Sequence, residues 1–523
     1  MTRLLAFLSR HRLALGALLV VGSLWLMLLD ALHVEWTVNP QYTYGWAVPL
    51  LVGFLLFQRW QARPAHAAVP VGFRFWLFVA ALALVLLPAR LIQEANPDWR
   101  LNVWLLAFAA IGLTLAVFYA VGGRAWLRHF GFPVIFFLVA VPWPTIIEAP
   151  VVRGLMRANA AMTVELLHGF GVPALQRGNL IEIAAGMIGI EEACSGIRSF
   201  QASLMLALFF GEMMRLRLTR RLALLALGLL LAFLFNLGRT LTLVTVALQQ
   251  DLPAMQRWHD PAGLVVLGGT FVILWWISHR LAPRRVPVPE PVAAPMPANL
   301  PAAIPLLRGF ALLAAWIVAV EVAVEVWYRA HERGLAAPVV WQVDPPRERA
   351  AFQELPLTEA TRQILRFDEG LNARWREPDG TAWQLIFLRW DPGRIGVQLA
   401  KNHTPEICLT SAGRQVISAT PPQSLEVAGL RLPFRSYVVT DRGATAHVFY
   451  CLWEDQHPDQ TFDSAALNFR SRLAAVAAGR RNLGQRSLEL VVWGQPNEAA
   501  ARAAVQRFLE QAIRKGAGAG EGS

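Results

Sequence analysis

The segment "LALLALGLLLAFLFNLGRTLTLVTVAL" (222–248) decides the fold class of this chain. A helix rises about 1.5 Å per residue, so a run of this length can cross the roughly 30 Å hydrocarbon core of a membrane. Asn236 and Arg239 are the only amide and charged residues in it. Because an ionisable side chain is costly inside a membrane, we expect Arg239 to belong to a functional site.

Working outward, the sequence predicts an all-α polytopic membrane core of about eight transmembrane helices, followed by a ninth span. The composition agrees, since 55% of the residues are hydrophobic, 16% are charged and the mean hydropathy is +0.41. No small-residue cleavage site follows Leu29, so we expect the first run to be retained rather than removed as a signal peptide. The other apolar runs, of which the second is short, are 13–30, 44–58, 74–92, 101–121, 128–144, 194–213, 262–278 and 306–328.

The net charge of +12 does not indicate a nucleic-acid partner. The basic residues are mostly arginines beside apolar runs, where the positive-inside rule and the anionic lipid headgroups of the bilayer account for them. No aromatic-basic groove accompanies them. With a cytoplasmic N-terminus, alternation of the spans places most arginine-rich loops inside and the chain beyond about residue 331 outside. Four arginines on the outer side depart from this pattern: Arg153, Arg157, Arg177 and Arg257.

The composition divides the chain into four parts: a membrane core (1–282), a Pro/Ala-rich linker (283–305), the ninth span (306–328) and an outer domain (331–523). The last part has the pattern of an α+β domain, in which we expect hairpins at 371–390 and 432–453 and a helix at 496–514.

A long outer-face excursion, 145–193, precedes the sixth span. It is expected to form an amphipathic helix and then a short hairpin that leads to Cys194.

Three reactive residues are predicted to lie near one level of the membrane. Cys194 begins the sixth span and His259 precedes the eighth, both on the outer side. Arg239 lies about 25 Å along the seventh helix from its inner end, in the outer third of the membrane. The order of the spans alone therefore brings these three residues to one face.

Each of these residues also has a plainer explanation. A cysteine is often a small buried hydrophobe, and a histidine at a membrane surface is often only an anchor. Against this, a helix start and nearby cations lower the pKa of a thiol, and Arg198 follows Cys194 by one turn. His259 could then transfer protons and Arg239 could bind an oxyanion, which favours nucleophilic catalysis. Supporting positions are Arg198, Asn236 and Glu192, although Glu191 and Glu192 would oppose a thiolate unless they pair with arginine or face water.

At these residues the sequence resembles the exosortase family of bacteria, which is related to the archaeosortases. The resemblance covers about residues 1–280 and rests on "EEACSGIRS" (191–199), "NLGR" (236–239) and "HDPAG" (259–263), in order on the expected helices. The family's cysteine, arginine and histidine match Cys194, Arg239 and His259.

The resemblance implies a cysteine protease or transpeptidase of the inner membrane. Its substrates would carry a C-terminal sorting signal, made of a Pro-Glu-Pro-type motif, a membrane helix and a basic cluster. Cys194 would form an acyl-thioester, Arg239 would serve as proton donor or charge stabiliser, and His259 as transition-state stabiliser or base. Such enzymes accompany exopolysaccharide and biofilm gene sets. The pattern implies no cofactor, and no His/Cys/carboxylate cluster has the spacing of a metal site.

The outer domain is similar to the exosortase-associated domain at "AKNHTPEICLTSAGRQV" (400–416), where His403 and Cys408 match its distinctive positions. In an oxidising compartment Cys408 and Cys451 could form a disulfide, which would leave Cys194 as the free thiol. A His403–Cys408 pair with its own chemistry, or inert cysteines, are the alternatives.

Two other functions fit a polytopic protein with polar residues in its spans. One is a transporter or assembly component for exopolysaccharide export, and the other is a non-catalytic assembly factor. A transport path should place polar residues at several depths, whereas here they are expected at one face.

Overall fold

A computed structural model describes most of the chain as two compact units. The core unit comprises residues 1–89 and 100–320, and the tail unit comprises residues 90–99 and 321–523. The residues described are 2–65, 69–178, 180–184, 186–189, 196–282, 303–334, 338–357, 361–362, 365–402, 405, 415–441, 444–456 and 468–515. Most of the predicted linker, 283–302, lies outside them.

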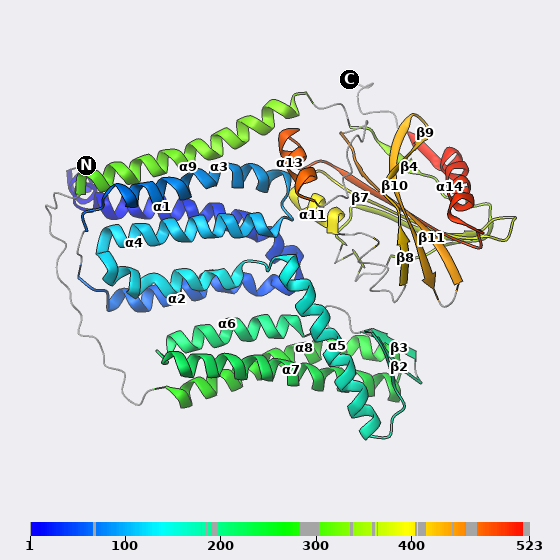
Figure 1. Ribbon diagram of the computed structural model, residues 1–523, viewed down its shortest axis with the longest axis horizontal. Helices are drawn as coiled ribbons and strands as arrows, with labels where there is room; N and C mark the ends of the chain where they lie inside the picture. Colours follow the sequence, from blue (N-terminus) through cyan, green and yellow to red (C-terminus); the bar gives the residue numbers. More distant parts are fainter. Residues whose placement is uncertain are drawn as a thin grey trace. The chain divides into compact units, whose positions relative to one another are not determined.

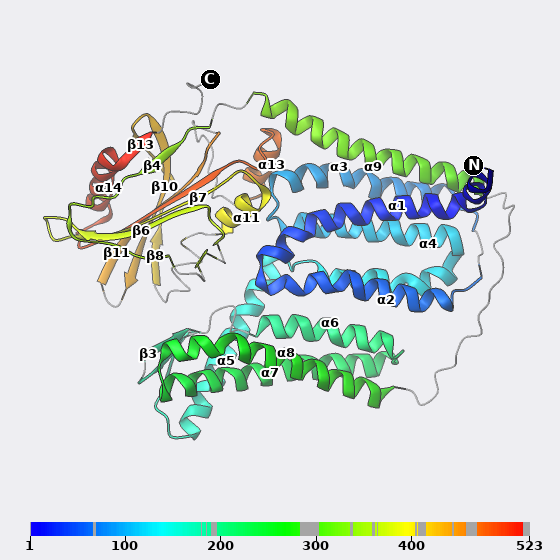
Figure 2. The same ribbon diagram turned by 180° about the vertical axis from the view of Figure 1, so that it is seen from behind.

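The core unit is built from long helices (Figures 1 and 2). Within it, α6, α7 and α8 pack against one another, and α1 packs against α4. The helices are α1 (Thr2–Val38), η1 (Pro40–Ala47), α2 (Val48–Gln61), α3 (Phe73–Ala95), α4 (Arg100–Phe136), η2 (Phe137–Ala140), α5 (Thr145–Gly169), α6 (Ile197–Met213), α7 (Leu218–Gln249), α8 (Leu252–Leu281) and α9 (Ala303–Glu332).

Six helices of the described residues are long and apolar enough to cross a membrane, so the chain is a multi-pass membrane protein. They are Ala14–Val38, Phe73–Ala95, Arg100–Ala140, Leu218–Gln249, Pro253–Leu281 and Pro305–Glu332. The predicted count of eight or nine spans is not confirmed. Two expected spans are too short by length, since α2 has 14 residues and α6 has 17. At 1.5 Å per residue these helices are only about 21 and 26 Å long.

The expected spans 101–121 and 128–144 join into one helical element that is interrupted at Gly123. Its φ of 64° and ψ of −158° lie outside the helical region, in a conformation that glycine adopts without steric cost. A Cβ at the neighbouring Gly122 would lie 1.9 Å from the Trp126 ring, so the turn also needs a residue without a side chain there.

The segment before α6 has the helix and the hairpin that the sequence predicts. Helix α5 is followed by β1 (Leu175–Arg177), β2 (Leu180–Ile183) and β3 (Gly186–Gly189), in an antiparallel sheet of that order. Ile181 and Ile188 are paired across β2 and β3 and are buried with Val164 of α5 and Val244 of α7. This small apolar core fixes the excursion on α7.

The tail unit contains an eight-stranded antiparallel sheet. Its strand order is β5-β6-β7-β12-β11-β10-β8, with β9 also paired to β10. The expected hairpins at 371–390 and 432–453 are present as β6–β7 and β10–β11. The strands are β5 (Ala350–Glu354), β6 (Glu369–Arg376), β7 (Ala382–Trp390), β8 (Gln415–Ala419), β9 (Gln423–Val427), β10 (Leu430–Asp441), β11 (Ala444–Glu454) and β12 (Gln485–Trp493).

The expected C-terminal helix is α14 (Glu498–Ala512), which packs on the sheet. Its Phe508 ring lies 5.2 Å from the Trp375 ring and 5.5 Å from the Trp383 ring. The helix is apolar on the side that carries Val505 and Leu509, both fully buried. The tail unit also contains α11 (Arg394–Asn402), α13 (Phe469–Ala477) and a small pair of strands, β4 (Trp341–Val343) and β13 (Ile513–Lys515).

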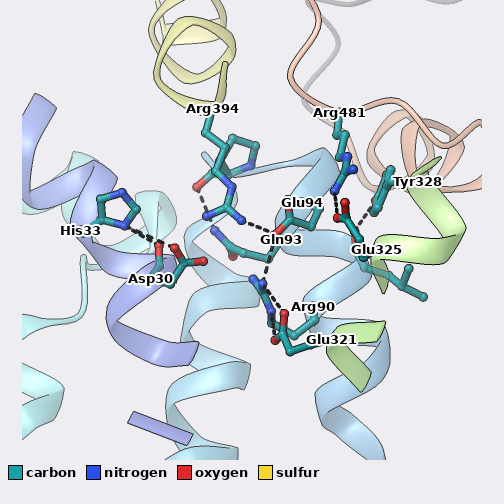
Figure 3. A network of polar contacts seen from close by, with 12 residues as sticks. Asp30, His33, Arg90, Gln93, Glu94, Glu321, Glu325, Tyr328, Arg394 and Arg481 are labelled. Atoms are coloured by element: carbon teal, nitrogen blue, oxygen red, sulfur yellow. Dashed lines mark hydrogen bonds and ion pairs between the residues drawn. The ribbon is translucent and has the colours of Figure 1, made fainter. Parts of the chain in front are cut away.

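The ends of α3 and α9 belong to the tail unit because arginine–carboxylate contacts hold them (Figure 3). Arg90 of α3 contacts Glu321 of α9 at 2.9 Å and Glu94 at 3.1 Å. These ends also meet arginines that follow in the sequence: Arg394 contacts Glu94, Arg472 contacts Asp98 at 2.7 Å, and Arg481 contacts Glu325 and Glu332 at 2.7 Å each.

Candidate functional site

The predicted nucleophile lies just before the described start of α6. Residues 190–195, which include Glu191, Glu192 and Cys194, are outside the described residues. Gly196 is the first described residue after them and is the N-cap of α6, with a left-handed φ of 84°. The position of Gly196 therefore limits where Cys194 can lie, two residues away.

Gly196 packs directly against Asn236 of α7. A Cβ at Gly196 would lie 2.9 Å from Cγ and Nδ2 of Asn236, which is too close for a side chain. Asn236 is 2% exposed. Glycine is thus required at 196 both for its conformation and for the close approach of α7. This contact brings the first predicted supporting residue to the start of α6.

A second polar contact, which the sequence analysis did not single out, ties α5 to the same part of α7. Asn159 Nδ2 donates to Thr240 Oγ1 at 2.9 Å, and Thr240 Oγ1 donates to the carbonyl oxygen of Asn236 at 3.0 Å. Asn159 is 1% exposed. The signal in the sequence was weak, because one asparagine on an amphipathic helix is ordinarily solvated.

Arg239 and His259 are hydrogen-bonded to each other, across α7 and α8. Nη2 of Arg239 lies 3.0 Å from Nε2 of His259 and 3.0 Å from its carbonyl oxygen. The guanidinium lies over Gly263, where a Cβ would make only ordinary contact with Nη2 at 3.6 Å. The structure therefore brings together the two described members of the predicted trio.

The partners of the His259 ring determine its tautomer. A guanidinium only donates hydrogen bonds, so Nε2 must accept the bond from Arg239. Nδ1 lies 3.0 Å from Oδ1 of Asp260 and therefore carries the proton that the carboxylate accepts. In this tautomer the lone pair of Nε2 faces Arg239.

The structure describes two of the remaining predicted residues, Arg198 and Cys451. Arg198 is exposed on the first turn of α6. Cys451 is buried on β11 in the core beneath α14. His403 and Cys408 lie outside the described residues, so the Cys408–Cys451 disulfide stays a prediction.

Comparison with known proteins bears on the membrane part of the chain. Residues 36–276 match the family model of transmembrane exosortases. Over these residues the chain belongs to that family. Exosortases are a family of membrane-embedded proteases and sorting transpeptidases, which supports peptidase activity for this chain. Searches of the curated proteins and of the solved structures gave no match. The exosortase match ends at residue 276, so the resemblance of the C-terminal part, 331–523, to an exosortase-associated domain stays a prediction.

Proposed function

We propose that this exosortase is a cysteine transpeptidase that cleaves C-terminal sorting signals of exported membrane-anchored proteins. The signal would consist of a Pro-Glu-Pro-type motif, a membrane helix and a basic cluster, and the products would serve exopolysaccharide and biofilm systems. The observation that carries the proposal is the arrangement on α7. Asn236 packs against Gly196, two residues from Cys194, and one turn later Arg239 is hydrogen-bonded to His259.

In the proposed reaction, the Cys194 sulfur attacks the peptide carbonyl carbon beside the motif. The thiol proton passes to Nε2 of His259 once the hydrogen bond from Arg239 shifts, and the guanidinium then stabilises the oxyanion that forms. Collapse of the tetrahedral intermediate breaks the C–N bond, and His259 returns the proton to the leaving amine. An acyl-thioester on Cys194 remains.

An acceptor nucleophile completes the proposed transpeptidation. It attacks the thioester carbonyl carbon and transfers its own proton to His259, and the C–S bond then breaks. Reprotonation of the sulfur restores the resting state. Every proton in both halves of the cycle passes through a single histidine, whose Nδ1 proton is held by Asp260.

The test is substrate processing in cells that co-express the protein with a candidate substrate carrying the sorting signal. Cys194→Ala should abolish processing while the protein still inserts in the membrane, and wild type but not Cys194→Ser should yield a thioester-linked adduct. Normal processing by Cys194→Ala would rule out the enzyme and favour the transporter or the assembly factor.

The proposed orientation places the N-terminus in the cytoplasm of a bacterium, the protein in the inner membrane and residues 331–523 in the periplasm. Topology reporters fused after residue 290 and after residue 340 should then give opposite signals, because α9 lies between them. The same signal from both would remove α9 from the set of spans.

A further inference from the structure

A buried charged cluster in the core unit has no role in the chemistry above. It is centred on Glu148 in the first turn of α5, which is 8% exposed. Oε1 of Glu148 accepts hydrogen bonds from Gln41 Nε2 and the Tyr42 hydroxyl, and Oε2 accepts one from Arg100 Nη1. Nη2 of Arg100 donates to Glu35 Oε1 at 3.0 Å. The cluster thus joins α1, η1, α4 and α5 through two carboxylates and one guanidinium.

Two residues of this cluster, Tyr42 and Arg100, also help to hold η2 and the segment between η2 and α5. Pro142 and Pro144 have no backbone N–H, so side chains of other elements bind this segment. Its hydrogen bonds come from Tyr44 to Val139 O (2.9 Å), Trp36 to Ala140 O (2.8 Å), Trp104 to Pro142 O (2.8 Å) and Arg100 to Trp143 O (3.2 Å), and the Trp143 N–H donates to the Tyr42 hydroxyl (2.8 Å).

Two contacts pass from this assembly to the first turns of α6. Nε2 of Gln201 donates to the Tyr42 hydroxyl at 3.3 Å. The Trp143 and Phe200 rings are 6.5 Å apart in an edge-to-face arrangement. Gln201 is fully buried and lies seven residues after Cys194. Helix α6 therefore has two polar neighbours near its start: Tyr42 contacts it at Gln201, and Asn236 contacts it at Gly196.

We propose that Tyr42, Glu148 and Arg100 are positioning residues that set the start of α6, whose N-cap Gly196 follows Cys194 by two residues, against α7. This inference rests on the proposed function, since it assigns these residues a purpose in the reaction of Cys194. The Tyr42 hydroxyl is the central atom, because it joins Glu148, the backbone at Trp143 and Gln201.

Loss of one hydrogen bond in this cluster should have a large effect on the position of α6, because the cluster is buried in a medium of low dielectric constant. Hydrogen bonds to a buried carboxylate are strong, and the three donors leave Glu148 little freedom to move. Burial also raises the pKa of Tyr42 above its ordinary value, so the hydroxyl keeps the proton that it donates. A displacement of about 1 Å in a reacting group can cost about 100-fold in rate.

The test uses Tyr42→Phe, which keeps the ring and removes only the hydroxyl. Tyr119→Phe is the matched control, because it makes the same change elsewhere in the core unit at a hydroxyl with no hydrogen bond among the described residues. We expect Tyr42→Phe to lower the saturating processing rate by about 10- to 100-fold while the apparent KM changes by less than about twofold. Tyr119→Phe should behave as wild type.

A second readout does not depend on catalysis. The rate at which a small neutral maleimide modifies Cys194 in the full-length protein can be followed by mass spectrometry of the modified peptide. Tyr42→Phe should slow this reaction by about threefold or more, because the thiolate is favoured only where the helix start and nearby cations surround it. Gln201→Met, which removes the contact from the other side, should act in the same direction.

The outcomes separate the two proposals. Equal processing and equal alkylation in Tyr42→Phe and Tyr119→Phe would overturn the positioning role. So would a lower melting temperature with an unchanged rate per folded molecule, since the cluster would then be structural only. If Cys194→Ala still processes substrate but Tyr42→Phe alters the alkylation of Cys194, the enzyme proposal fails and the positioning of α6 stands.

Discussion

At the scale of single residues, the hydrogen bond between Arg239 and His259 narrows the roles that each can take. The sequence leaves both as possible proton carriers or charge stabilisers. In the structure His259 Nε2 lies against the guanidinium, which can only donate, so Nε2 is the acceptor of this hydrogen bond and the arginine supplies the positive charge. This division favours His259 as the base and Arg239 as the group that binds the oxyanion.

If His259 is the base and Arg239 binds the oxyanion, the result of His259→Gln can be predicted. The amide oxygen of glutamine can still accept a hydrogen bond from Arg239, but it cannot carry a proton. We expect His259→Gln to lose processing by at least about 100-fold, as much as His259→Ala does, because general base catalysis is removed in both. The measurement is the single-turnover rate in detergent or membranes. Substantial rescue by glutamine relative to alanine would mean that the histidine mainly orients Arg239.

Gly196 allows a second test at this scale. Gly196→Ala places a methyl group 2.9 Å from the Asn236 side chain and forces alanine into a left-handed conformation that costs about 1–2 kcal/mol. Processing should fall by about 10-fold or more. Gly238→Ala on α7 is the control, since a Cβ there meets no other atom within 4 Å.

The double substitution Gly196→Ala/Asn236→Ala separates the two effects. It removes the 2.9 Å contacts with Cγ and Nδ2 of Asn236 but keeps the 3.1 Å approach to the Cβ of residue 236 and the backbone strain, so it tests whether the amide group matters. A double variant with the additive loss of both single variants would contradict a direct contact between these positions.

At the scale of elements, the sequence was most informative where the periodicity was long or the turn chemistry was specific. The Asp379-Gly380 turn and the α14 pattern predicted real elements, because alternation and helical spacing act locally. The second span was predicted to start at residue 44, four residues before α2, because apolar residues continue into η1. The cluster around Glu148 joins it to residues 48 to 107 positions away, so no local pattern could reveal it.

The start of α14 predicts a pH dependence of the tail unit. Hydrogen bonds from Ser436 and Arg502, with the nearby Arg502 charge, lower the pKa of Glu498 below its ordinary value, despite its partial burial. A lowered pKa stabilises the folded state above the unfolded value of about 4.3, and this contribution is lost as the pH falls through the folded value.

The corresponding variant is Glu498→Gln. It should lower the thermal stability of the full-length protein at pH 7, and the difference from wild type should shrink as the pH falls through the lowered pKa of the folded state. Unfolding in detergent between pH 3 and 7, followed by intrinsic fluorescence, measures this. Glu510→Gln, near the opposite end of α14, is the control. A wild-type advantage that persisted unchanged at pH 3 would show that charge is not its source.

At the scale of the whole molecule, the division into units does not follow the division of the sequence. Composition predicts a boundary after the ninth span, whereas the tail unit begins within α9 and includes the end of α3. Ion pairs contribute to this division. The carboxylates on these helix ends are contacted by Arg90, Arg394 and Arg481. A hydropathy profile cannot predict such ion pairs, because it does not report which distant residues are in contact.

The strongest prediction at this scale concerns Arg472 and Asp98. Their side chains are 9% and 4% exposed and lie 2.7 Å apart, and the guanidinium also lies over the Trp99 ring. Removing one partner of a buried ion pair leaves the other charge desolvated, which costs about 3–5 kcal/mol. Arg472→Ala should therefore destabilise the tail unit strongly, as measured by thermal or denaturant unfolding of the full-length protein.

The matched control is Arg431→Ala, which removes an exposed pair with Glu426 at 3.4 Å and should cost less than about 1 kcal/mol. The double variant Arg472→Ala/Asp98→Ala should be more stable than Arg472→Ala alone, because no carboxylate is then left buried at that position. If Arg472→Ala cost no more than Arg431→Ala, the stability of the tail unit would not depend on this ion pair. The contact between the Trp99 and Phe469 rings, which are 5.7 Å apart, would then have to hold the end of α3 in the tail unit.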